Sequence, residues 1–227
     1  CDLTTHVSQE AIEYFVLTKA VPQRKIMFMP NGINTQQFDL ARKDRAKIRQ
    51  EINSEPGTFI WLHVGRLVHE KAQDLLIQAF KLVISKAPKT QLLIAGDGPL
   101  HAQHSRLIDS LGLKGSVKLL GRRTDVPQLM QAADGFVLSS RIEGSPLVLG
   151  EAMASGLPTV STQVSGAAQL LTTNDKLGPI GDPEALALAM LTTMDNVATD
   201  TQRSLRRTHV ESKYAMPAVA QQWIQIY

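Results

Sequence analysis

The sequence predicts an α/β fold, a Rossmann-like parallel sheet with helices on both faces. Short apolar runs that end in glycine or serine alternate with segments whose apolar residues recur at helical spacing. The spacing also matters, because strands separated by a single helix form βαβ units whose strands run parallel. The composition of the 227 residues, 43% hydrophobic and 20% charged, is typical of a chain that packs a core.

The first unit of the repeat is a strand, a helix and a second strand. Residues 58–64 form a continuous apolar run that ends at Gly65, which predicts a buried strand. Residues 91–95 repeat this pattern and end at Gly96. The helix between them, closed by Ala87-Pro88, is predicted from regularly spaced apolar residues: Ala72, Leu75, Leu76, Ala79, Phe80 and Val83.

The same alternation continues along the chain to residue 161. Asp125 is predicted to cap a short helix that has Pro127 near its first turn, and Ser145-Pro146 is predicted to open another helix. The remaining elements are predicted as a helix after Pro99 and as strands at 116–120, 135–138 and 158–161.

The two ends of the chain do not continue this repeat. Residues 1–30 are predicted to hold a helical segment and a strand at 25–29, followed by a turn at Pro30-Asn31-Gly32. From Arg203 to Tyr227 the sequence predicts a long helical stretch with a break near Met216-Pro217.

Charge narrows the classes of partner. The net charge of +3, from 24 basic and 21 acidic residues, allows an anionic ligand without demanding one. Basic residues cluster at 42–49 and 203–207, but only 5% of the residues are aromatic and none interleaves with the clusters, so no nucleic-acid partner is expected. Each cluster is interpreted as the solvated face of a helix, and attraction to an anionic membrane surface is the second interpretation.

Cysteine usage and hydropathy bear on location. The single cysteine, Cys1, cannot build a disulfide framework or a thiolate metal cage, which favours a reducing, cytoplasmic setting. No apolar stretch is long enough for a membrane span, and Asp2, His6 and Glu10 argue against a secretory signal. A chain that begins at Cys1 rather than Met suggests a fragment.

Two cations are the first candidates for chemistry. Ligands of a parallel sheet bind at the carboxyl ends of its strands, near helix N-termini. Arg66 follows the strand end at Gly65, and Lys71 opens the next helix, so both are expected over this edge. Two cations suit a diphosphate better than a carboxylate because a diphosphate carries more charge. The alternative is a pair of solvated surface cations.

The second candidate runs from Glu143 to Glu151. Gly144 and Ser145 are expected to leave backbone amides free at a helix N-terminus, where anions bind, and Pro146 suits the first helical position. Glu151 lies further along that helix, and its side chain is expected to tilt back toward the N-terminus. The two carboxylates would flank a phosphate-sized site. The alternative is a loop glutamate and a helix-flank glutamate with no shared role.

The remaining motifs predict no further site. Gly96-Asp97-Gly98-Pro99 lacks the third glycine of a dinucleotide fingerprint and is predicted to be a tight strand-to-helix turn. His101 and His104 lie on one helix, but no third metal ligand accompanies them, and no Asp-x-Asp motif occurs. No metal site is therefore predicted, and Arg66, Lys71 and a helix dipole are expected to neutralise the diphosphate.

Together these residues resemble a known family. From about Asn31 to Tyr227 the chain is similar to the C-terminal, donor-binding half of a GT-B fold glycosyltransferase, and more narrowly to the family 4 retaining enzymes (glycosyl transferases group 1). The helix ending in Trp223 and Tyr227 resembles the family's closing helix. Six segments carry the resemblance in the family's order: 30–34 with Phe38, 65–71, 93–99, 117–121, 132–134 and 140–160.

The resemblance implies roles by position. The residues implied to be catalytic are Arg66, Lys71 and Glu143, with both cations on the donor diphosphate and Glu143 on the donor sugar. The residues implied to bind the donor nucleotide sugar are Gly65, Arg122, Gly144, Ser145, Pro146, Leu147 and Glu151. The amides from Gly144 to Leu147 would bind the distal phosphate. Glu151 would take the ribose hydroxyls, and the backbone at Arg122 and Arg123 would meet the base. No metal or other cofactor is implied, and the substrate would be a nucleoside diphosphate sugar, a UDP-sugar by family frequency.

The resemblance also implies the organisation of the chain. Residues 1–30 would be a remnant of the N-terminal acceptor domain and linker, and residues 31–227 the donor-binding domain. The function implied is retaining hexosyl transfer to a glycan or lipid-linked acceptor, with peripheral membrane association, and the chain alone is expected to be inactive. Ala72 stands where the family has glycine, and Gln169 where it often has glutamate. The alternatives are an epimerase-like GT-B protein and a non-catalytic nucleotide-binding module.

Overall fold

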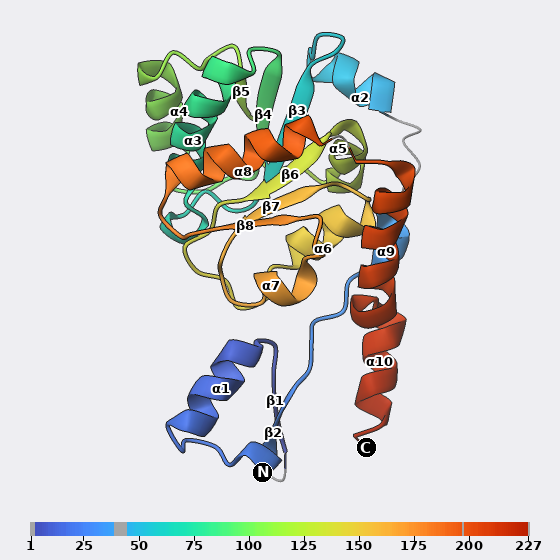
Figure 1. Ribbon diagram of the computed structural model, residues 1–227. Coiled ribbons are helices and arrows are strands. Elements are labelled where there is room, and N and C mark those ends of the chain that lie inside the picture. Colours follow the sequence, from blue (N-terminus) through green and yellow to red (C-terminus); the bar gives the residue numbers. More distant parts are fainter. Residues whose placement is uncertain (1–2, 39–44, 197, 227) are drawn as a thin grey trace.

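The centre of the molecule is a parallel sheet. The computed structural model describes residues 3–38, 45–196 and 198–226 (Figure 1). Its largest sheet has six strands in the order β5-β4-β3-β6-β7-β8. These strands are β3 Phe59–Val64, β4 Thr90–Ala95, β5 Val117–Leu119, β6 Gly135–Leu138, β7 Thr159–Thr162 and β8 Lys176–Gly178. The chain runs from β3 to one edge and then from β6 to the other, which is the doubly wound order. The predicted Rossmann-like class is confirmed.

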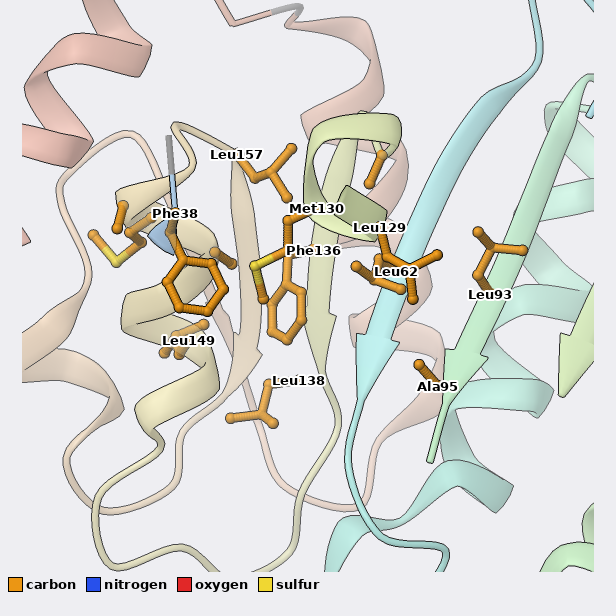
Figure 2. Close-up of a cluster of buried hydrophobic side chains, with 14 of the residues drawn as sticks. Phe38, Leu62, Leu93, Ala95, Leu129, Met130, Phe136, Leu138, Leu149 and Leu157 are labelled. Atoms are coloured by element: carbon orange, nitrogen blue, oxygen red, sulfur yellow. The ribbon is translucent and has the colours of Figure 1, made fainter. Parts of the chain in front are cut away.

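Helices cover both faces of this sheet, and each face buries its own core. On one face lie α3 Gln73–Lys86, α4 His101–Ser110 and α8 Pro183–Asp195, and on the other α2 Arg45–Glu51, α5 Val126–Ala132, α6 Leu147–Ala154 and α9 Asp200–Tyr214. Successive side chains of β3 alternate between the faces, so Trp61 packs in the first core and Leu62 in the second. Figure 2 shows the second core, which includes Leu62, Met130 and Phe136.

The ends of the predicted strands of the repeat agree with the structure to within one residue. The helix predicted from Ala72 begins at Gln73, because Ala72 itself has left-handed backbone angles, with φ 51°. No prediction covered β8, α8 or the short helix α7 Ala167–Leu170. A helix-start signal, Asp182-Pro183, precedes α8, and the Asp182 side chain accepts a hydrogen bond from Ala185 N.

The first described residues form a separate small unit. Strand β1 Thr4–His6 pairs in parallel with β2 Ile26–Phe28, and α1 Gln9–Leu17 connects them. The predicted helix and strand are therefore present, and β1 is an addition. In Figure 1 this unit lies apart from the large sheet, on the side of α7 and α10. Cys1 and Asp2 lie outside the described residues.

The turn predicted at Pro30-Asn31-Gly32 is wrong. Residues 30–32 form no turn, and Ile33, which follows them, forms a parallel bridge with Ala215. Ile33 N donates to Tyr214 O at 2.7 Å, and Met216 N donates to Ile33 O at 3.0 Å. These two bonds attach Ile33 to the junction of two helices, so the local turn propensity of the preceding Asn-Gly pair is overridden.

The predicted break in the C-terminal helical stretch is confirmed. Helix α9 ends at Tyr214, and α10 runs over Met216–Ile224. Ala215 between them is extended, with φ −62° and ψ 144°, and Pro217 follows in the first turn of α10. Tyr227 lies outside the described residues. Within those described, no helix is long and apolar enough to cross a bilayer.

The interpretation of the two basic clusters as solvated helix faces is wrong for the arginines. Arg45 and Arg49 both pair with Asp134, and Arg45 Nη1 also donates to Ala132 O at 2.8 Å, near the C-terminal end of α5. Arg206 is buried and its Nε donates to Asp175 Oδ1 at 2.7 Å. These guanidiniums satisfy carboxylates and helix-end carbonyls where α2 and α9 pack on the domain. Residues 42–44 lie outside the described part of the chain.

The prediction that Asp125 caps a short helix is confirmed in position but not in its side-chain hydrogen bond. Asp125 occupies the N-cap position of α5 but makes no side-chain hydrogen bond to its backbone. Both carboxylate oxygens instead accept from Arg123, whose Nε and Nη2 lie at 2.7 and 2.6 Å. A bidentate, charge-assisted pair is stronger than a single hydrogen bond from a helix amide, so the carboxylate pairs with Arg123.

Candidate functional site

A cavity opens at the carboxyl edge of the sheet, where the candidate residues were expected. Its volume is about 730 Å³. The loops after β3 and β6 and helix α6 bring most of the predicted site residues together in it. These residues are Gly65, Arg66, Lys71, Glu143, Ser145, Pro146, Leu147 and Glu151. Gly144 does not line the cavity but precedes Ser145 in the same turn. Residues up to 86 positions apart in sequence thus share one crevice.

Lys71 and Glu143 form an ion pair inside this cavity. Lys71 Nζ lies 2.6 Å from Glu143 Oε1, which also accepts a hydrogen bond from Ser140 Oγ at 2.6 Å. The Glu143 side chain is 9% exposed and that of Lys71 23%. Lys71 is held from the other side through its carbonyl oxygen, which accepts from Ser139 Oγ. The ammonium is therefore fixed in the cavity with N–H donors left for a ligand.

Arg66, by contrast, is a solvent-exposed residue at the mouth of the same cavity. Its carbonyl oxygen accepts a hydrogen bond from Gln73 Nε2 at 2.8 Å, so the backbone of the loop is anchored while the side chain is exposed to solvent. A paired, partly buried cation and an exposed cation thus line the same cavity, and both can contact an anionic ligand.

The turn before α6 provides backbone donors. The sequence predicted Pro146 as the first helical residue. The helix instead begins at Leu147, and Pro146 is its N-cap. Leu147 N donates to Ser145 O at 2.9 Å and is not free, which corrects that part of the expectation. The N–H groups of Gly144 and Ser145 have no acceptor within the described residues. Together with the α6 dipole they can bind an anion.

Glu151 lines the same cavity from inside α6. Burial raises the pKa of its carboxyl group above the ordinary value, and no cation is paired with it in the described part of the chain. A half-buried carboxylate without a partner is costly, and a ligand that donates hydrogen bonds to it lowers that cost.

A second cavity of about 430 Å³ continues from the first. The two share Val64, Gly65, Arg66 and Val126, and the second adds Asp97 and the remaining predicted residue, Arg122. Its walls at Ala95, Gly96 and Val126 are largely apolar, which suits a flat ring, while Arg122 is exposed at the rim.

Two glycines let the loops that form these cavities touch. A Cβ on Gly96, whose φ is +146°, would lie 1.9 Å from Gly65 O, and one on Gly98 would lie 2.5 Å from Leu67 O. Leu67 N donates to Asp97 O at 3.0 Å. The predicted tight turn at 96–99 therefore supports the backbone that carries Arg66.

The comparisons with known proteins agree with this arrangement. The family model described as glycosyl transferases group 1 matches residues 44–208, more than half of the chain. This chain belongs to the group 1 glycosyltransferases. Its Rossmann-like domain is that of a GT-B fold.

Several relatives of this glycosyltransferase chain have names that state an activity. It is 32% identical over 173 residues to mannosylfructose-phosphate synthase of Agrobacterium fabrum, covering 71% of this chain and 38% of that protein. It is 32% identical over 150 residues to the Escherichia coli UDP-Gal:alpha-D-GlcNAc-diphosphoundecaprenol alpha-1,3-galactosyltransferase, covering 64% and 38%. The chain thus matches less than two thirds of the length of these relatives.

A solved structure is similar over the whole chain. Anabaena Alr3699/HepE in complex with UDP and glucose has a TM-score of 0.88 and 27% identity, and the match covers 100% of this chain and 63% of that one. Sucrose-phosphate synthase from Thermosynechococcus elongatus gives a TM-score of 0.86 at 25% identity, covering 100% and 58%.

Two residues behind the site have no counterpart in the sequence predictions. His63 on β3 is fully buried, with Nδ1 3.0 Å from Val137 O and Nε2 3.2 Å from Gln73 Nε2. Gln73 in turn holds the Arg66 carbonyl. A histidine inside an otherwise apolar strand just before the Gly65 loop was the available signal, because a buried polar side chain needs a partner.

This buried histidine predicts acid sensitivity. Burial lowers the pKa of His63 from 6.5 to about 4. The unfolded chain therefore takes up the proton first, and the stability that neutral His63 provides is lost as the pH falls from about 6.5 toward 4. We expect this residue to account for a loss of about 3 kcal/mol in the free energy of unfolding over that interval.

The measurement is urea unfolding of the wild type and of His63→Asn between pH 7 and pH 4. The variant should be less stable at pH 7 and lose less stability on acidification. The exposed His101 supplies the control, since His101→Asn should keep the wild-type slope. Equal slopes for His63→Asn and the wild type would contradict the assignment.

Proposed function

We propose that this chain is the donor-binding part of a retaining hexosyltransferase that uses a nucleoside diphosphate sugar. The observation that carries the proposal is the convergence of Arg66, Lys71, Glu143 and Glu151 on one cavity beside an open helix N-terminus. The related HepE, solved with UDP-glucose, and the galactosyltransferase relative support a UDP-sugar as donor.

Each side chain has a role in this proposal. Lys71 and Arg66 neutralise the diphosphate, and the Gly144 and Ser145 amides receive its distal phosphate. Glu143, held by Lys71 through one oxygen, offers the other to hydroxyls of the donor sugar. The donor's remaining parts extend along the two joined cavities: Glu151 accepts from the ribose, and the base enters the apolar part beside Arg122.

The proposed reaction breaks the bond between the sugar's anomeric carbon and the diphosphate oxygen. The acceptor hydroxyl attacks from the same face, and its proton passes to the departing phosphate, so the configuration is retained. The protein's contribution is to orient the donor and stabilise the charge that develops on the leaving group. In this proposal the two cations and the amides of the Ser145 turn neutralise that negative charge, without a metal or other cofactor.

The acceptor site belongs to another part of the protein in this proposal. Residues 1–30 are proposed to be the end of an acceptor domain and its linker, and residues 31–227 the donor domain with its closing helix. A glycan or a lipid-linked sugar would be the acceptor. Since the chain matches less than two thirds of its relatives, we expect it to bind donor but to transfer little sugar by itself.

Calorimetric titration of the 227-residue chain with UDP tests the proposal. We expect saturable binding by the wild type, and about tenfold weaker binding by Glu151→Gln, because an ionised acceptor for the ribose hydroxyls is lost. Binding of inorganic pyrophosphate should be unchanged in that variant.

Glu184→Gln, an exposed change on α8, is the matched control and should bind UDP like the wild type. Failure of the wild type to bind UDP or UDP-glucose would overturn the proposed function. Undiminished UDP binding by Glu151→Gln would overturn the ribose assignment alone.

A further inference from the structure

A hydrogen-bonded cluster joins the small N-terminal unit to the loop after β7. Ser8, the buried N-cap of α1, has its Oγ 2.6 Å from Ser165 Oγ. Ser165 Oγ donates to Glu10 Oε2 at 3.0 Å, and Gly166 N donates to Glu10 Oε1 at 3.4 Å. One carboxylate thus holds two consecutive residues of a loop more than 150 positions away in sequence.

The electrostatics of Glu10 agree with this geometry. Burial favours its neutral form, but hydrogen bonds, including those from Ser165, Ser8 and Gly166, outweigh burial and lower the pKa of Glu10. The carboxylate is ionised at neutral pH and accepts charge-assisted bonds, which are the stronger kind.

The loop held by Glu10 is the wall behind the anion-binding turn. Gly166 has left-handed backbone angles, with φ +76°. A Cβ placed on it would lie 3.3 Å from Pro146 Cδ, 3.4 Å from Gly144 O and 3.6 Å from Ser145 Cα. Gly166 therefore packs directly on the three residues that precede α6. If Gly166 shifts, these three residues must shift with it, or a gap opens behind them.

We propose that Glu10 is a positioning residue for the distal-phosphate turn: from α1 it fixes Ser165 and Gly166, and through them the backbone of Gly144 and Ser145. The inference rests on the proposed function, because it needs a phosphate at that turn. It assigns to the N-terminal unit an indirect part in donor binding, since none of the residues described in that unit lines the main cavity.

Charge and position make opposite predictions for Glu10, which makes the role testable. As an anion on the phosphate side of the domain, Glu10 repels a diphosphate, so its removal would tighten binding if charge were its only effect. If Glu10 positions the turn, its removal weakens binding, and it does so only for ligands that carry the distal phosphate.

The experiment compares UDP with UMP, which lacks the distal phosphate, in titrations of the 227-residue chain. For Glu10→Ala we expect about tenfold weaker UDP binding and unchanged UMP binding. Ser165→Ala should act in the same direction, and Glu10→Gln, which keeps one acceptor oxygen, should fall between Glu10→Ala and the wild type. Glu13→Ala, at an exposed position on the same helix, controls for the lost charge and should bind both nucleotides normally.

Three results would overturn the inference. Glu10→Ala could bind UDP as tightly as the wild type or more tightly, which leaves only the charge effect. It could lose UDP and UMP binding equally, which is a general loss of folding that thermal melting would also show. A wild type that binds no UDP overturns the proposed function and the inference with it, and is distinguished from the first two because the wild type itself fails.

Discussion

Replacing Lys71 with methionine is expected to weaken UDP binding by about a hundredfold, a change of about 2.7 kcal/mol. Two effects act in the same direction. The variant loses the fixed ammonium that would donate to the diphosphate, and charge-assisted bonds of this kind contribute about 1.5–3 kcal/mol. It also leaves the Glu143 carboxylate in the cavity with Ser140 as its remaining hydrogen-bond donor among the described residues, and that unpaired charge repels phosphate.

Titration calorimetry with UDP measures the loss, and a second substitution separates the two effects. Adding Glu143→Gln to Lys71→Met should restore part of the affinity for UDP, because the unpaired carboxylate is removed while the missing ammonium is not. Lys86→Met, exposed near the end of α3, should bind as the wild type does. An affinity of Lys71→Met within twofold of the wild type would exclude Lys71 from the diphosphate site.

The substitution Gly96→Ala is expected to lower the free energy of unfolding by more than about 4 kcal/mol, at the extreme of single substitutions. The added Cβ would lie 1.9 Å from Gly65 O, which is backbone and cannot move aside without the loop. The φ of +146° is also a conformation that an alanine rarely adopts. Separation of the two loops would shift Arg66 as well, so donor binding should fall along with stability.

Urea unfolding of Gly96→Ala and Gly115→Ala provides the comparison. Gly115 has no heavy atom within 4 Å of an added Cβ, and its φ is not in the left-handed region, so its variant should stay within about 0.5 kcal/mol of the wild type. If Gly96→Ala is too unstable to purify, the soluble yield of the Gly115 variant shows that the loss is specific to position 96. A cost below about 1 kcal/mol at position 96 would show that the contact between the loops is dispensable.

The success and failure of the sequence predictions follow from how local each signal is. The strand at 58–64 is predicted from a continuous apolar run and the helix after Ala72 from apolar periodicity over a dozen residues. Both are confirmed. Helix α8 was missed although Asp182-Pro183 marks its start, so that omission was avoidable. The wrong turn at 30–32 was not avoidable, because the bonds that hold the adjacent Ile33 come from Tyr214 and Met216, which are distant in sequence.

The basic clusters show the same limit. Arg45, Arg49 and Arg206 read as solvated in sequence, since nothing nearby in the chain pairs with them. The structure supplies Asp134 and Asp175 from other elements. A run of basic residues predicts only that cations are near one another. The packing of the chain decides which of them are buried and form ion pairs that stabilise the fold.

By itself the sequence determined the strand–helix repeat, the edge of the sheet that carries the candidate site and the residue types placed at that edge, because hydrophobic periodicity and strand-ending glycines act within a few residues. Only the tertiary structure decided that Lys71 pairs with Glu143, 72 residues away, and that Gly96 supports the Arg66 loop. It likewise decided that Glu10 reaches the loop behind Ser145. These contacts depend on distances between segments that meet only when the sheet is assembled.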